Sequence, residues 1–272
     1  IKDDVLKKFI SRENSLWWLT EMGWVNSAMV YDNDLDCCVM YGGYVDGTLT
    51  NEEYYADGSN VECYWEITGY ATRVLALEYE RTGDIKYRDL AKKMGDVIIK
   101  NLNDGSVNPE NNGSMHTQDY YDGTEVNEYV NMSYIFDHAQ VQMGLLELGR
   151  VMEEKGDAGY QTYKDGGERI GKFLYFVYEN NSNVLPQIWY RNNLTNDRVN
   201  ATGTKEVIGM EYLYKNTNNE NYKDIAESEL NRIYSKNASY SGSDHHGRSY
   251  TAYGFIRGFE WFNNISYLEE AR

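Results

Sequence analysis

Apolar residues recur at helical spacing on both sides of a Gly-Asp pair near residue 83. Residues three and four apart share one face of a helix, so this spacing predicts two helices rather than strands. Gly83 suits the left-handed position that ends a helix, and Asp84 can accept hydrogen bonds from the free N–H groups of the next helix. The stretch 64–101 therefore predicts a helical hairpin. Its apolar positions are Val74, Leu75, Leu77, Leu90, Met94, Val97 and Ile98.

The same arrangement returns three more times along the chain. Each copy has an apolar helix, a two-residue turn and a tyrosine three residues after the turn. The spacing between copies is irregular, which fits hairpins joined by loops of variable length better than a tight solenoid. We predict hairpins over 64–101, 132–178 and 204–235, and a fourth that begins near Arg248. The turn pairs are Gly83-Asp84, Gly156-Asp157, Asn218-Asn219 and Asn263-Asn264, and the tyrosines are Tyr87, Tyr160, Tyr222 and Tyr267.

The remaining segments predict one helix and several long loops. Residues 1–22 carry an apolar helical face that ends at Gly23, and 24–63 break into Asp-Gly and Gly-Gly turns. We expect the latter to be a long ordered loop, and Val184–Tyr190 with the Asn-rich turn after it to form a short β-hairpin. The sequence therefore predicts one all-α domain over 1–272, built of helical hairpins, with long loops at one end and minor β structure.

Charge and aromatic content narrow the partners of this chain. A net charge of −17 makes nucleic acid or an anionic membrane surface an unfavourable partner. No stretch approaches the roughly 18 apolar residues that a membrane span needs. The 26 tyrosines are unusual, and aromatic faces with a phenol group suit sugar rings. These features favour carbohydrate as a partner.

Several features favour an exported protein. The chain begins at Ile1 rather than Met, and seven Asn residues fit the N-glycosylation acceptor pattern. In an oxidising compartment Cys63 can bridge to either Cys37 or Cys38, or all three can remain thiols. The expected location is extracellular or at the cell surface. The acceptor residues are Asn112, Asn131, Asn180, Asn193, Asn200, Asn237 and Asn264.

No metal or cofactor is expected. There is no CxxC pattern, so a zinc site is not predicted. Asp32, Asp34 and Asp36 alternate as an EF-hand loop begins, but Gly is absent at the sixth position and Glu at the twelfth. A solvated turn fits them better than a calcium site.

Three polar stretches lie just before the first helix of a hairpin, at the end where long loops are expected to gather. Glu66 and Asp137 would form the carboxylate pair needed for attack on a glycosidic bond or for proton abstraction. Cationic and aromatic residues near them would bind the sugar, and Gln140 would contact the substrate or orient Asp137. Alternatively, both acids are first-turn residues that face a helix dipole. The binding candidates are Trp65, Tyr70, Gln140, His245, His246, Arg248 and Tyr250.

No Ser-His-Asp order, Walker loop or HExxH pattern is present in the sequence. These absences argue against the enzyme classes that those motifs define.

The same polar stretches resemble a known family. Glu66 to Tyr70 followed by Thr82-Gly83-Asp84 is similar to the E-x-T-G-Y … T-G-D pattern of six-hairpin (α/α)-toroid proteins, which are related to unsaturated glucuronyl hydrolases and sugar epimerase domains. Residues 136–140 resemble their F-D-x-x-Q segment, and 246–254 their R-G-Q-x-W-x-x-Y-G segment. The resemblance covers most of 40–272. It implies an (α/α) toroid, with Asp137 as acid or base and Glu66 as second carboxylate.

Departures from the family pattern affect the last segment and the hairpin count. His246 stands where Arg is expected, Arg248 replaces Gln, and Tyr250 replaces Trp. About four hairpins are present where a closed toroid has six. An incomplete toroid and one whose remaining hairpins lie outside this sequence are both open. The sequence stops at Arg272, early in the second helix of the last hairpin, so we expect a partner, a second copy or residues outside this sequence to cover that helical face.

The leading expectation is an exported, carbohydrate-active enzyme that cleaves an acidic or modified polysaccharide, with epimerisation as a close alternative. The second hypothesis is a non-catalytic, glycosylated surface or filament-associated scaffold that keeps the toroid fold and binds glycans. A protein-binding helical repeat is the third. The enzyme hypothesis requires Glu66 and Asp137 to converge on one open cleft.

Overall fold

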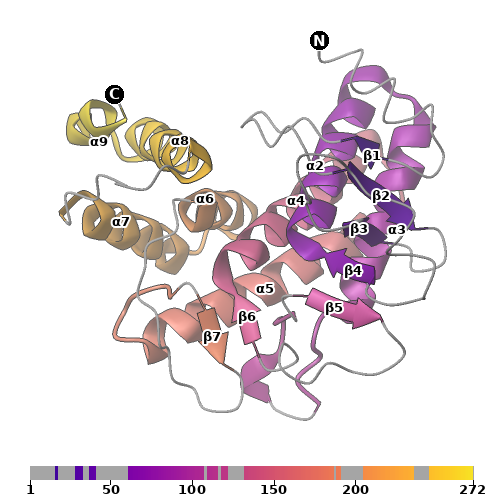
Figure 1. Ribbon diagram of the computed structural model, residues 1–272. Helices are drawn as coiled ribbons and strands as arrows, with labels where there is room; N and C mark the ends of the chain where they lie inside the picture. The colour runs from indigo at the N-terminus through magenta and orange to yellow at the C-terminus, as the bar shows by residue number, and fades with distance from the viewer. Residues whose placement is uncertain are drawn as a thin grey trace, which may run out of the picture.

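The structure is a computed structural model that describes residues 16–17, 28–32, 37–40, 61–106, 109–115, 118–121, 132–186, 188–190, 205–235 and 245–271. Four helical hairpins dominate it (Figure 1). The three hairpins predicted over 64–101, 132–178 and 204–235 are confirmed, and the fourth begins at His245, near the predicted Arg248. Their helices are α2 (Trp65–Thr82), α3 (Ile85–Asn101), α4 (Ile135–Lys155), α5 (Tyr160–Asn180), α6 (Lys205–Thr217), α7 (Glu220–Ser235), α8 (His245–Phe262) and α9 (Ile265–Glu270).

The turns of the four hairpins share one backbone feature. Each has a residue with positive φ directly after the first helix: Gly83 at 70°, Gly156 at 75°, and Asn218 and Asn263 at 54°. Glycine and asparagine tolerate this left-handed conformation, which ends a helix. In three of the turns the next residue caps the second helix through its side chain, because Asp84, Asn219 and Asn264 each accept a hydrogen bond from the backbone N–H two residues on.

The tyrosine of each turn repeat contributes to the hydrophobic core. Tyr222 and Tyr267 are buried, and Tyr87 and Tyr160 lie against the core. This explains why the sequence repeats a tyrosine at the same distance from every turn.

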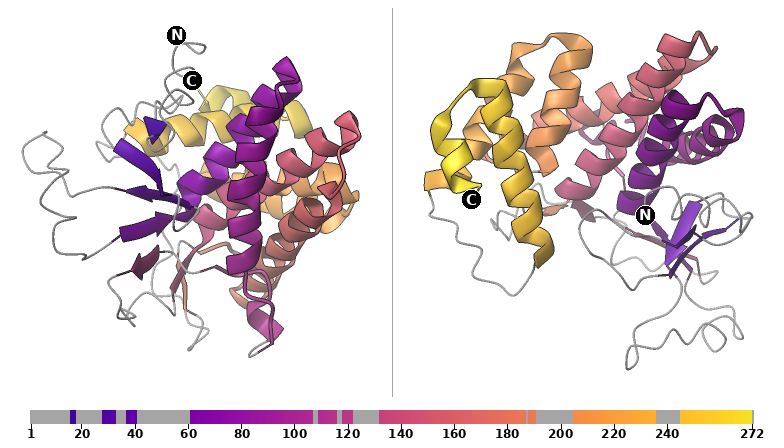
Figure 2. Two further views of the ribbon diagram at one scale, coloured as in Figure 1. Left: turned by 90° about the vertical axis from the view of Figure 1, so that its right-hand side faces the viewer. Right: turned by 90° about the horizontal axis from the view of Figure 1, so that it is seen from above.

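The first helices of the hairpins form a row, and the second helices lie outside it. Helix α2 packs on α4, α4 on α6 and α6 on α8, while each also packs on its own hairpin partner. Figure 2 shows the resulting arc of paired helices. This arrangement is that of an (α/α) toroid, so the predicted fold class is confirmed.

Helix α4 lies between α2 and α6 in the row and is buried along most of its length. Every residue from Asp137 to Gly149 is buried. A Cβ placed on Gly144 would lie 2.4 Å from the carbonyl oxygen of Gly69, so α2 and α4 can approach this closely only with glycine there.

Two small sheets accompany the helices. The first has five antiparallel strands in the order β1 (Leu16–Trp17), β2 (Ala28–Asp32), β3 (Cys37–Met40), β4 (Val61–Tyr64) and β5 (Gln118–Tyr121). The second pairs β6 (Met132–Tyr134) with β7 (Ile188–Tyr190). A short 3-10 helix, η1 (Pro109–Asn111), follows α3.

These strands correct two predictions. The helix over 1–22 is wrong at Leu16–Trp17, which form β1, and its other residues lie outside the described ranges. The loop over 24–63 contains β2, β3 and β4. The segment that ends at Tyr190 contributes β7, which pairs with β6, and the turn after it lies outside the described ranges, so the hairpin predicted there stays a prediction. The division into a single domain stays a prediction.

Within the described part of the chain, no helix is long and apolar enough to cross a bilayer. In the same ranges, no three His, Cys, Asp or Glu side chains are grouped to hold a metal ion. Asp34 and Asp36 lie outside these ranges.

Candidate functional site

The three polar stretches predicted from the sequence all begin inner helices. Glu66 and Asp137 lie in the first turns of α2 and α4, and His245 begins α8. Contacts between α2 and α4 advance in the same direction along both helices, from Gly69 against Val141 to Glu80 against Arg150. The two helices are therefore parallel, and their N-termini lie on the same side of the molecule.

Several predicted site residues are described only as backbone. Glu66, His245, His246, Arg248 and Tyr250 lie in helices, but their side chains are outside the described part of the structure. The separation of the Glu66 and Asp137 carboxyl groups therefore stays a prediction.

Asp137 lies in the first turn of α4, which several contacts from other segments hold in place. Its side chain is only 7% exposed. The next residue, His138, accepts a hydrogen bond at Nε2 from the Met115 backbone N–H at 2.9 Å, and its ring lies 5.1 Å from that of Phe173. Ser133 donates to the Met115 carbonyl at 2.7 Å. These contacts hold the first turn of α4, and the positive end of its helix dipole favours the Asp137 carboxylate.

Gln140 lies one turn beyond Asp137 and is 1% exposed. Within the described part of the chain, neither its Oε1 nor its Nε2 has a hydrogen-bond partner. Burying an amide without partners costs free energy, so such a group is a candidate for contact with a ligand or water.

Trp65 differs from its predicted role as a stacking surface. It is 1% exposed and belongs to the hydrophobic core, so neither face of its ring is open to a ligand in this structure. Tyr70 is partly exposed. An aromatic residue at the start of an apolar helix packs inward as readily as outward, which is why the sequence did not separate the two.

A second polar cluster lies further along the inner helices, and the sequence analysis missed it. The Arg73 guanidinium of α2 lies 5.3 Å from the ring centre of Tyr212 of α6. Burial lowers the pKa of Arg73, but electrostatic interactions with Tyr212, Tyr253 and Glu147 and a hydrogen bond with Tyr253 outweigh it and raise the pKa overall. Arg73, Glu147, Tyr212 and Tyr253 thus bring together one side chain from each inner helix. We call these four residues the inner-wall cluster.

The tyrosine of α6 titrates outside its ordinary range in this cluster. Burial raises the pKa of Tyr212 to about 12, and hydrogen bonding with Glu147 adds to the rise. Tyr212 therefore stays a neutral phenol at physiological pH and can donate a hydrogen bond.

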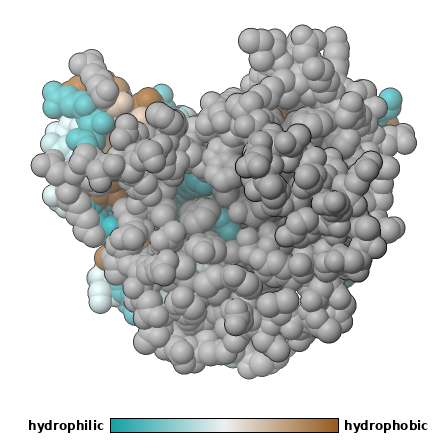
Figure 3. All heavy atoms as spheres, viewed as in Figure 1, coloured by the Kyte–Doolittle hydropathy of each residue, from teal (hydrophilic) through white to brown (hydrophobic). Residues whose placement is uncertain are grey.

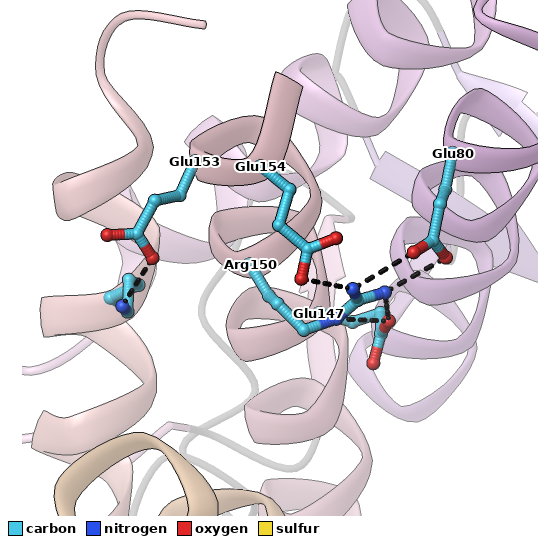
Figure 4. A network of polar contacts seen from close by, with 6 residues as sticks. Glu80, Glu147, Arg150, Glu153 and Glu154 are labelled. Atoms are coloured by element: carbon cyan, nitrogen blue, oxygen red, sulfur yellow. Dashed lines mark hydrogen bonds and ion pairs between the residues drawn. The ribbon is translucent and has the colours of Figure 1, made fainter. Parts of the chain in front are cut away.

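Ion pairs join the inner helices next to this cluster (Figure 4). Arg150 of α4 binds Glu80 of α2 through both terminal nitrogens, at 3.0 and 2.9 Å, and also contacts Glu147 and Glu154. The hydrogen bonds that Arg150 donates to Glu80 raise the pKa of Arg150 and lower the pKa of Glu80.

The next pair of inner helices is joined in the same way, because Arg257 of α8 donates to Glu211 of α6. Arg73 differs from both of these arginines. Among the described residues, no carboxylate lies within ion-pair distance of it, and its Nε has no hydrogen-bond partner. Its partners are instead the Tyr253 side chain, which forms a hydrogen bond with it, and the more distant charge of Glu147, whereas buried arginines normally have a carboxylate in direct contact.

Glu206 is a buried acid that the sequence did not single out. It lies in the first turn of α6, and burial raises its pKa to about 7. Glu229 raises this pKa further, whereas Lys205 and Arg232 lower it. Since Glu229 and Arg232 belong to the outer helix α7, Glu206 faces away from the inner-wall cluster.

The predicted glycosylation residues fall in different places. Asn112 and Asn180 are exposed, and Asn264 caps α9. Asn131, Asn193, Asn200 and Asn237 lie outside the described ranges. Modification of these residues stays a prediction.

The space-filling view shows a recess between the side of the molecule that carries α8 and the side that carries α2, with hydrophilic residues visible inside it (Figure 3). The recess lies on the concave side of the arc. A ligand that approaches the inner helices would enter from there.

Comparison with known proteins supports the fold. No family model matches the sequence, and neither does any curated protein. Three similar solved structures are a GH76 alpha-mannanase from Bacteroides thetaiotaomicron (14% identity, TM-score 0.56, 78% of this chain and 55% of that one), a D-mannose isomerase (14%, 0.58, 83% and 59%) and a cellobiose 2-epimerase from Bacillus thermoamylovorans (15%, 0.60, 89% and 63%).

These neighbours are six-hairpin (α/α)-toroid proteins, so the resemblance inferred from residues 66–84, 136–140 and 246–254 is confirmed at the level of the fold. All three are named as enzymes of carbohydrate metabolism. The chain spans less than two thirds of the length of each of them.

Proposed function

We propose that this chain is part of a carbohydrate-active enzyme that binds an acidic polysaccharide along its inner helices and cleaves it at their N-terminal ends. The observation that carries the proposal is the inner-wall cluster. Helix packing alone favours apolar side chains between parallel helices, yet here an arginine, a glutamate and two tyrosines come together from all four. The names of the structural neighbours support a sugar as the ligand.

Arg73 is the basis for proposing an acidic sugar. Its guanidinium lacks a carboxylate in the described part of the chain, so a uronate carboxylate would supply the missing charge through a bidentate contact. Tyr212 lies beneath the guanidinium, and because its O–H bonds to Glu147, its phenol oxygen would accept a hydrogen bond from a sugar hydroxyl. His245, His246 and Arg248 at the start of α8 would add positive charge at the entrance.

Asp137 and Glu66 carry the proposed chemistry. One would protonate the glycosidic oxygen while the other acts as nucleophile or activates water. In glycosidases generally, carboxyl groups about 5 Å apart give retention, and a separation of about 6.5–9.5 Å gives inversion. Lyase cleavage or epimerisation would use the same residues for proton abstraction. Gln140 would hold the substrate or Asp137 in place.

The test is activity on a panel of neutral and uronate-containing oligosaccharides. We expect Asp137→Asn to lower kcat at least about a hundredfold, as removal of a general acid or base does. Arg73→Met should raise KM for uronate-containing substrates and leave neutral ones unaffected. Asp165→Asn, an exposed acid on α5, is the matched control. Full activity of Asp137→Asn would exclude the carboxylate mechanism.

A non-catalytic scaffold that binds glycans is the second candidate. It is favoured by the low exposure of Asp137, at 7%, and by the burial of Trp65 in the core. In that case the chain would bind the uronate oligosaccharides without turnover, and Asp137→Asn would leave the affinity unchanged.

Export of the protein is part of the same proposal. The exposed acceptor residues Asn112 and Asn180 support it. Mass spectrometry of the protein from its natural source would detect glycans on these peptides, and their absence together with an intracellular location would contradict it.

A further inference from the structure

A pocket of about 170 Å³ lies on the outer helix of the second hairpin, away from the inner helices. It opens between α5 and η1. Three apolar residues, Pro109, Phe173 and Phe176, and two cationic residues, Arg169 and Lys172, contribute to its wall. Glu110 and Asn112 complete the rim. Of these residues, Phe173 also contacts the candidate site, because its ring packs against His138.

The two phenylalanines of the pocket wall pack against other aromatic rings of the protein. Phe173 is 1% exposed and packs against the His138 ring at 5.1 Å. The Phe176 ring meets Trp189 edge to face at 6.1 Å. Because both rings are supported by packed aromatic neighbours, the pocket has a fixed apolar surface.

The loop side of the pocket is tied to α5 by Arg169. Its Nη2 donates to the Asn103 carbonyl at 2.8 Å, and its Nε donates to Asn112 Oδ1 at 3.2 Å. A Cβ on Gly113 would lie 2.2 Å from the Arg169 carbonyl oxygen, so the loop backbone presses directly on the helix. The pocket is therefore formed before any ligand arrives.

Lys172 is the cationic residue of this pocket that can pair with a ligand. Arg169 is occupied by the loop, and Lys164 on the same helix is paired with Glu153 at 2.9 Å. Lys172 is exposed, and within the described part of the chain it has no hydrogen bond or ion pair. In a chain of net charge −17, an unpaired lysine beside an aromatic surface marks a place for an anionic ligand.

We propose that this pocket is a second carbohydrate-binding site that holds a single sugar ring bearing a carboxylate. The apolar C–H face of the ring would lie on Phe176, and the carboxylate would pair with Lys172. A volume of 170 Å³ equals that of about five or six water molecules, which admits one ring and not an oligosaccharide. The site goes beyond the proposed function, because it would hold part of a polysaccharide outside the reacting region.

The test is isothermal titration calorimetry of the full chain with glucuronate, glucose and benzoate as probes. We expect glucuronate to bind more tightly than glucose or benzoate. Lys172→Met should weaken glucuronate binding about tenfold, as loss of a charged contact does. Lys164→Met, on the same helix but outside the pocket, should leave the affinity unchanged.

Two further variants separate this site from the proposed active site. Arg73→Met and Asp137→Asn should both retain the glucuronate affinity that depends on Lys172. The proposal is overturned if Lys172→Met binds glucuronate as the unmodified chain does, if glucose binds equally well, or if only benzoate binds. Loss of binding in Arg73→Met alone would assign the sugar acid to the inner helices instead.

Discussion

Gly69 and Gly144 set the distance between the first two inner helices. A Cβ on Gly144 would lie 2.4 Å from the Gly69 carbonyl oxygen, and one on Gly69 would lie 2.6 Å from the Cα of Val141. Both obstacles are backbone atoms, which cannot rotate away. The closeness of α2 and α4 therefore depends on the absence of two side chains.

Gly144→Ala should destabilise the fold by about 1–3 kcal/mol, the usual cost of overpacking, despite the better helix propensity of alanine. The free energy of unfolding in urea measures it. Gly258→Ala is the matched control, because the atom it would meet is a methyl group of Leu230 that can rotate. Equal losses in both variants would contradict the proposed backbone contact.

Glu206 makes the stability of the chain depend on pH. Its pKa in the folded chain is about 7, above the ordinary 4.5, because burial disfavours the carboxylate. The folded state holds the proton more tightly than the unfolded state, so its contribution is complete below about pH 4.5 and is lost as the pH rises through 7. The negative charge of Glu229 also raises the pKa of Glu206.

We expect Glu206→Gln to remove this dependence. Unfolding free energies at pH 5 and pH 8 should differ less in the variant than in the unmodified chain, by up to about 3 kcal/mol for a shift of this size. Glu220→Gln, an exposed first-turn acid of α7, is the control and should leave the pH dependence unchanged. A variant that loses as much stability between pH 5 and pH 8 as the unmodified chain would refute the assignment.

At the scale of the element, the turn of the third hairpin combines a left-handed residue with a side-chain helix cap. Asn218 takes a left-handed φ of 54°, and Asn219 then accepts a hydrogen bond from the Asn221 N–H at 3.1 Å. The left-handed conformation at Asn218 favours glycine, whereas the cap at Asn219 requires a side chain that accepts a hydrogen bond. The two neighbouring asparagines therefore differ in which substitutions they tolerate.

Replacing these two asparagines should change stability in opposite directions. Asn218→Gly should stabilise the chain by about 0.5 kcal/mol, because glycine adopts positive φ without strain. Asn219→Ala should cost about 1 kcal/mol through loss of the cap. Thermal unfolding of both variants measures the difference. Destabilisation by Asn218→Gly would show that its side chain has another role.

These turn residues also explain how much of the structure was predictable from the sequence. Gly83-Asp84 and its repeats act within a few residues, so the hairpins could be inferred from local pattern alone. The strands could not, because Val61 pairs with Tyr121 and Tyr134 with Ile188, far apart in sequence. Alternation in such short segments is indistinguishable from a series of turns.

The residues of the candidate site also differ in whether a local sequence pattern could predict them. Asp137 was found because it opens a helix beside a recognisable motif. Arg73, Tyr212 and Tyr253 lie in the middle of apolar helices with no local signal, and only the packing of four hairpins brings them together. The burial of Trp65 likewise depends on which face of α2 the other elements cover.

At the scale of the whole molecule, the arc has a rigid centre and an open end. Helix α4 is buried continuously from Asp137 to Gly149, whereas α9 is short and leaves Ile265 58% exposed. Local opening follows burial and contact, so the two helices should differ in stability within one folded chain. The residues proposed for catalysis and binding, Asp137, Gln140 and Glu147, lie on the rigid helix.

Native-state hydrogen exchange tests this gradient. Amides of α4 should exchange only through global unfolding, so their protection should change with denaturant as the unfolding free energy does. Amides of α9 should exchange far faster and with little dependence on denaturant. If α4 and α9 exchanged alike, α4 would not be a stable centre, and the geometry of a site fixed at its first turns would have to come from a ligand. Slow exchange confined to α4 and its contacts on α2 would instead mean that the site is organised before any sugar binds.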